Sequence, residues 1–177
     1  GVEVFLKNMG DHELGAAAFD TDSGKRIEIV LRENSYGKFL KISEGKGQQW
    51  SKVIIPASGL ASVYGEVAAC IGYGTAKTAD AIKHPVAIHE KKLRVEAKVV
   101  FVDLLENNIG RYIKLSTKAP NTGKSTVVIP ATAGGDLLSA IRTTCDVAKG
   151  ADAGHALAAK FPAPPQPEHR GGGGGGG

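Results

Sequence analysis

The chain has 177 residues and a formal net charge of +4 at pH 7, with 42% hydrophobic and 23% charged residues. This composition supports a buried core and excludes a chain that is disordered throughout, and no apolar run approaches the roughly 18 residues of a membrane-spanning helix. Two cysteines, Cys70 and Cys145, are too few for a disulfide framework, which favours a reducing, intracellular compartment. Both are predicted to pack on the apolar sides of helices rather than to react.

The first half of the chain contains four strand-like segments and then a helical one. Residues 13–19 are a possible first strand. Residues 26–32 alternate apolar and polar side chains, and an Asn- and Gly-containing turn leads into a third strand over 38–43. A fourth strand over 52–55 ends at a proline. The period then changes to that of an amphipathic helix, whose apolar face is formed by Leu60, Val63, Tyr64, Val67 and Ile71.

The second half repeats this plan. Residues 33–43 return as 106–116 with Lys replaced by Arg, Phe by Tyr and Leu by Ile, and residues 51–57 return one residue out of step as 125–131. Strands over 91–97 and 98–105 precede the second turn, and a helix follows it with Leu137, Leu138, Ile141, Cys145 and Ala148 on one face. Ser58 and Thr132 are the predicted N-caps of the two helices. A period of about 73 residues is typical of a duplicated small domain.

The duplication predicts an α+β fold. Two tandem ββββα repeats are expected to pack as one intramolecular pair, in which each antiparallel sheet is followed by a C-terminal helix. The expected boundaries are an N-terminal extension over 1–12, repeat I over 13–74, a linker over 75–90, repeat II over 91–149, and a tail over 150–177. The tail is rich in Ala and Pro and ends in seven glycines, so it is predicted to be a spacer, a docking ligand or a flexible arm.

The repeated motif identifies a family. Glu-Asn-x-x-Gly-Lys/Arg-aromatic-Leu/Ile-Lys, placed after an alternating strand and before Ile-Pro-Ala and a helix, resembles the PUR repeat of Pur-alpha-like single-stranded nucleic-acid-binding proteins. Two copies in tandem resemble the family's intramolecular repeat pair, whose fold is similar to that of the Whirly proteins. The resemblance covers roughly residues 13–149.

The resemblance also implies a binding site. In the family, single-stranded DNA or RNA is held by the hairpin asparagine, by nearby basic residues and by an aromatic side chain that stacks on a base. Matched position by position, these roles fall on Arg32, Asn34, Lys38 and Phe39 in the first copy and on Asn107, Arg111 and Tyr112 in the second. Lys41 and Lys114 lie two residues beyond the aromatics, on the same strand face, and complete the candidate site.

Some positions depart from the family pattern. Leu105 replaces a frequent lysine, and Tyr36 and Ile109 stand where the family is often basic. These losses predict weaker binding by the second copy. The asparagines also have a purely structural interpretation as turn residues, and exposed aromatics occur in protein interfaces as well.

Two functions remain open. The leading hypothesis is a non-catalytic protein that binds single-stranded nucleic acid, RNA in preference to DNA, by base stacking, amide contacts and phosphate contacts. The alternative is a structural or protein-interaction subunit of a larger ribonucleoprotein complex, such as one for organellar RNA processing, with a reduced nucleic-acid site. Homomeric or heteromeric protein partners through the repeats are expected in either case, and no membrane association.

Nothing in the sequence indicates an enzyme. The histidines lack a nucleophile or carboxylate at catalytic spacing, no Cys/His cluster has zinc spacing, and no cofactor is expected. The segment Gly123-Lys124-Ser125-Thr126 lacks the first glycine of a P-loop and is predicted to be a hairpin loop. A mitochondrial location is slightly favoured, with the nucleus or cytoplasm as alternatives, and the start at Gly1 is as compatible with an imported, processed protein as with a trimmed chain.

Overall fold

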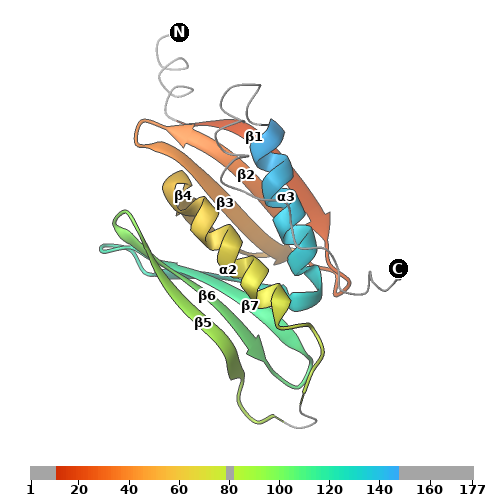
Figure 1. The fold of residues 1–177 in the computed structure, drawn as a ribbon. Helices are drawn as coiled ribbons and strands as arrows, with labels where there is room; N and C mark the ends of the chain where they lie inside the picture. Colours follow the sequence, from red (N-terminus) through yellow and green to blue (C-terminus); the bar gives the residue numbers. More distant parts are fainter. Residues whose placement is uncertain (1–10, 79–81, 148–177) are drawn as a thin grey trace, which may run out of the picture.

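The computed structural model describes residues 11–78 and 82–147, and these form two ββββα repeats (Figure 1). Repeat I is a four-stranded antiparallel sheet with neighbouring strands in chain order, a 3-10 turn and a helix. Its elements are β1 (Asp11–Asp20), β2 (Arg26–Asn34), β3 (Gly37–Lys46), β4 (Gln49–Pro56), η1 (Ala57–Gly59) and α2 (Leu60–Gly72).

Repeat II has the same plan and the same strand order. Its elements are β5 (Val86–Val95), β6 (Lys98–Glu106), β7 (Arg111–Lys118), β8 (Lys124–Pro130), η2 (Ala131–Ala133) and α3 (Gly134–Val147). The predicted α+β class and the tandem ββββα arrangement are therefore confirmed. Neither described helix is long and apolar enough to cross a membrane.

The two repeats exchange their helices. Helix α3 of repeat II packs on β1 and β2, helix α2 of repeat I packs on β5 and β6, and the two helices lie side by side (Figure 1). Each sheet has one apolar face that must be covered, and the fully buried side chains Ile29, Ile42, Leu104 and Ile113 come from these inward faces. Each repeat thus depends on the other repeat's helix to cover its own sheet.

The edge strands β4 and β8 meet at the seam between the repeats. The Lys25 amine donates to the backbone oxygen of Val128 on β8 at 3.2 Å, and the Lys98 amine donates to the backbone oxygen of Ile54 on β4 at 3.0 Å. These reciprocal bonds cross from one repeat to the other and satisfy carbonyl groups that an edge strand would otherwise leave unpaired.

The cysteines pack as predicted. Cys70 and Cys145 are both free and buried, on α2 and α3. Burial raises the pKa of the Cys70 thiol to about 12, with smaller contributions from the nearby charges of Glu66 and Asp103. A thiol with that pKa stays protonated at neutral pH, so Cys70 is a packing residue.

The predicted N-caps are wrong. Ser58 and Thr132 lie inside the 3-10 turns that precede the helices, and α2 has Gly59 as its N-cap, without a side-chain capping bond. The Ser58 hydroxyl instead donates to the Glu96 carboxylate in repeat II at 2.7 Å. The Ser58 hydroxyl therefore bonds to a residue distant in sequence instead of capping the helix as the local sequence predicted.

Strand β5 begins at Val86, earlier than the predicted 91–97, and includes residues expected in the linker. A register shift between Ala87 and His89 interrupts the apolar–polar alternation there, which hid this part of the strand from the sequence pattern. The predicted tail over 150–177, the helix position Ala148 and residues 1–10 of the predicted extension lie outside the described residues.

Candidate nucleic-acid interface

The candidate residues gather at two hairpins, one in each repeat. Phe39 lies directly opposite Arg32 on β2 and Pro56 on β4, and Tyr112 lies directly opposite Leu105 on β6 and Pro130 on β8. Directly opposite residues of an antiparallel pair share one face of the sheet, and here it is the face away from the helices. The sequence therefore placed both aromatics correctly on the outward faces.

Each hairpin asparagine shapes its own turn. The side-chain oxygen of Asn34 accepts the backbone N–H of Tyr36 at 2.8 Å, and that of Asn107 accepts the backbone N–H of Ile109 at 2.9 Å. Gly37 completes the first turn with a φ of +127°, which other residues rarely adopt. The structural interpretation of the asparagines thus holds for their oxygens, and their side-chain amide nitrogens remain as donors for a ligand.

A cleft opens beside each hairpin, and each cleft is built from both repeats. The first has a volume of about 450 Å³ and combines the hairpin of repeat I with the β5–β6 turn of repeat II. It is lined by Asn34, Tyr36, Gly37, Lys38, Phe39, Ile54, Pro56, Ala57, Ser58, Glu96 and Lys98.

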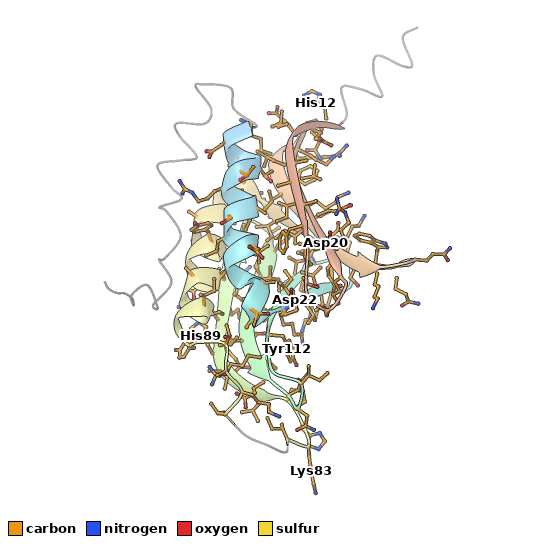
Figure 2. All side chains as sticks on the ribbon, turned by 90° about the vertical axis from the view of Figure 1, so that its right-hand side faces the viewer. His12, Asp20, Asp22, Lys83, His89 and Tyr112 are labelled. Atoms are coloured by element: carbon orange, nitrogen blue, oxygen red, sulfur yellow. The ribbon has the colours of Figure 1, made fainter. Side chains whose placement is uncertain are left out.

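The second cleft is the counterpart of the first. It has a volume of about 590 Å³ and combines the hairpin of repeat II with the β1–β2 loop of repeat I. Its lining is Asp22, Ser23, Lys25, Asn107, Ile109, Gly110, Arg111, Tyr112, Val128, Pro130 and Thr132. Asp22 and Tyr112, from different repeats, lie close together in Figure 2. The duplication has thus produced two related cavities, each lined by an asparagine, an aromatic and a basic residue.

The comparison with known proteins identifies the family of the chain. The family model described as "PurA ssDNA and RNA-binding protein" matches residues 6–147. The chain belongs to this family. A curated relative, "Transcription factor Pur-alpha 1" of Arabidopsis thaliana, is 30% identical over 112 residues, which cover 60% of this chain. The match spans only 33% of the length of that relative.

The two equivalent hairpin cations of this PurA-family chain have different surroundings. Arg111 donates from Nε to the Glu106 carboxylate at 3.0 Å and from Nη1 to the backbone oxygen of Tyr73 at 2.8 Å, and its side chain is only 8% exposed. Glu106 is buried as well and accepts the backbone N–H of Thr78 at 2.9 Å. Arg111 therefore ties the second hairpin to the end of α2, whereas Lys38 in the first cleft has no such ion pair among the described residues.

The strand faces also differ in charge. In repeat I, Arg32 stands beside Phe39 with its Nη1 4.0 Å from the Glu13 carboxylate, and Lys41 follows on the same face. In repeat II, Lys114 lies directly opposite Asp103. Burial, together with the charge of Glu90, raises the pKa of Asp103 above its usual range. The more favourable surroundings for phosphate lie on repeat I.

Sequence reasoning missed several residues that belong to this surface. Lys25 and Lys98 line the clefts of the opposite repeat, which no local motif reveals. Trp50 lies on the outward face of β4, directly opposite Gly45 on β3. Strand parity would have indicated its position, because Trp50 lies two residues before Lys52, the first residue of the predicted fourth strand. Among residues 11–78 and 82–147, no group of three His, Cys, Asp or Glu side chains is placed to hold a metal ion.

Proposed function

We propose that this chain is a non-catalytic protein that binds single-stranded nucleic acid at the two hairpin clefts, with RNA preferred over DNA. The observation that supports this most is the repetition of the cleft itself. Asparagine, aromatic and basic side chains recur at matched positions in two cavities that both repeats build together. A surface that served only for folding would have no need to keep this set twice.

The proposed mechanism assigns one task to each residue type. A base stacks on Phe39 or Tyr112, and the amide nitrogen of Asn34 or Asn107 donates to a base edge or a 2′-hydroxyl, which an RNA strand alone provides. The phosphates of the first cleft are held by Arg32, Lys38 and Lys41, and those of the second by Lys114, with Arg111 acting mainly through the shape of its hairpin. We expect the first cleft to bind more tightly because more of its cations face the ligand.

A second candidate is a protein-interaction subunit of a ribonucleoprotein complex, with organellar RNA processing as its setting. It is supported by the hairpin tips, where Tyr36 and Ile109 are 96% and 95% exposed. Large apolar side chains exposed at matched positions are common in protein interfaces. In that case the tips would bind a protein and the clefts would contribute little affinity for nucleic acid.

The test is a fluorescence-anisotropy titration of the full chain with labelled single-stranded RNA, single-stranded DNA and duplex of the same sequence. Phe39→Ala and Tyr112→Ala should each weaken binding by about 1–3 kcal/mol, the range for one stacked base. Tyr73→Ala removes an aromatic ring that is 50% exposed and lines neither cleft, so it is the control and should change the affinity little. Unchanged affinity in the Phe39→Ala/Tyr112→Ala double variant, with its fold intact by circular dichroism, would refute the stacking mechanism.

A further inference from the structure

The first cleft continues along strand β4. A smaller cavity of about 290 Å³, distinct from the second cleft, shares Ile54 and Lys98 with the first cleft and adds Lys52 on the side away from the hairpin. The opposite wall of this cavity comes from the β7–β8 hairpin of repeat II, at Thr122 and Gly123. The outward side chains of β4 therefore line one groove that leads away from Phe39 along the sheet.

Trp50 is the next outward residue of β4 beyond this groove. Its indole is 44% exposed, and its ring N–H donates to the backbone oxygen of Gly47 at 2.9 Å, which holds the ring in one orientation. A Cβ on Gly45, the residue directly opposite, would lie 2.3 Å from Cδ2 of the indole. The indole thus lies against the bare backbone of Gly45, and its other face is turned to solvent.

The charges around this ring favour a polyanion. Lys52 and Lys41 share the outward face, and among the described residues no carboxylate lies within ion-pair distance of either amine. By strand register, the carboxylates in the rows of Trp50 and Lys52 belong to Asp20 and Glu28, and Arg26 binds both, at 3.4 and 3.2 Å. The path from Lys41 to Trp50 therefore carries net positive charge.

Repeat II has no equivalent of this path. Lys118 and Lys124 stand opposite each other where repeat I has Gly45 and Trp50, and the Lys124 amine lies 5.1 Å from the centre of the Phe101 ring. The position of Trp50 is thus occupied by a lysine in repeat II, so the extension belongs to repeat I.

We propose that Trp50 is a second base-stacking position, and that one single strand of nucleic acid runs from Phe39 along the β4 groove to Trp50. The proposal rests on the function proposed above. It extends the binding site from the first cleft to a longer path that ends at Trp50. Gly45 lies six residues beyond Phe39 on β3, or about 20 Å at about 3.3 Å per residue. With about 3.4 Å per stacked nucleotide, that distance corresponds to about six nucleotides.

Trp50 is the only tryptophan of the chain, so its emission reports on this position directly. The unmodified full chain is titrated with single-stranded oligonucleotides of about four and about twelve nucleotides, and anisotropy of labelled copies measures binding in parallel. We expect the longer oligonucleotide to quench the emission as it saturates, and the shorter one to bind with little quenching. Saturation by the longer oligonucleotide without any change in emission would overturn the proposal while leaving the proposed function intact.

Variants test the contribution of the ring to affinity. In the wild type the longer oligonucleotide should bind more tightly than the shorter one. Trp50→Ala should reduce this ratio of affinities by about 5- to 150-fold, and Trp50→Phe should retain most of it. Gly45→Ala, which displaces the ring without removing it, should act like Trp50→Ala. Tyr73→Ala is the control, because Tyr73 is 50% exposed and lines none of the three cavities.

The remaining outcomes are also decisive. Equal quenching by the two oligonucleotides would contradict a path that begins at Phe39, and a full affinity gain in Trp50→Ala would exclude stacking on the indole. Absence of binding by either oligonucleotide in the anisotropy measurement would refute the proposed function and this extension together.

Discussion

Removal of the two equivalent hairpin cations should change the stability of the protein by very different amounts. Arg111→Ala leaves the Glu106 carboxylate, whose side chain is only 2% exposed, buried without its guanidinium partner. Breaking a buried ion pair by removing one partner costs about 3–5 kcal/mol of the free energy of unfolding. Lys38→Ala removes a cation without such a partner, beside Glu33, whose side chain is 42% exposed, and should change that free energy by less than about 0.5 kcal/mol.

Urea denaturation followed by circular dichroism measures the free energy of unfolding of both variants. The m-value should stay unchanged if unfolding remains two-state. The variant Glu106→Gln in the Arg111→Ala background provides an internal control. It removes the unpaired charge, so it should recover part of the lost stability. Equal stabilities for Arg111→Ala and Lys38→Ala would refute the argument that the second hairpin cation serves the fold.

Three further predictions follow from individual positions. Lys38→Ala should make the slope of log affinity against log salt shallower by about 0.7, the value for one phosphate contact on a single strand, as measured by anisotropy across salt concentrations. Gly37→Ala should destabilise the protein by more than about 1 kcal/mol because of the φ of +127°, whereas Gly65→Ala, in helix α2 with open space around the added Cβ, should stabilise it by about 0.4–1 kcal/mol. Both are measured by thermal and urea unfolding, and equal signs would contradict the backbone argument. Burial lowers the pKa of Lys98, so the unfolded chain binds more protons between the folded pKa and the ordinary value of 10.5. The stability of the wild type relative to Lys98→Met should therefore rise with pH across that window, and a difference that stays flat would show that burial does not penalise the charged amine.

Local patterns were sufficient for the elements and for the faces of the sheets. The alternation around Ile29 identified a strand with one buried side, and the repeated Glu-Asn-x-x-Gly turn predicted both hairpins. Phe39 and Tyr112 followed onto the outward faces from strand parity alone. Register disturbances were not visible in the same way, because the shift beside His89 hides the start of β5 from a period-two pattern.

Partners distant in sequence were beyond that kind of reasoning. Ser58 has the identity and position of a helix cap, yet its hydroxyl bonds to Glu96 in the other repeat. Arg111 matches the cation of the first hairpin, yet Glu106 and the end of α2 occupy its guanidinium. These outcomes depend on which charges meet after the helices exchange, and no local window contains both partners.

The sequence alone therefore determined the duplication, the ββββα order, and the asparagine, aromatic and basic residues of each hairpin. Those features depend on periodicity and turn chemistry, which act over a few neighbouring residues. The tertiary structure decided that each cleft is shared between repeats, that Arg111 is committed to a buried ion pair, and that the first cleft continues along β4 to Lys52. Solvent access and charge pairing are properties of the assembled molecule, so only the packing of one repeat against the other could set them.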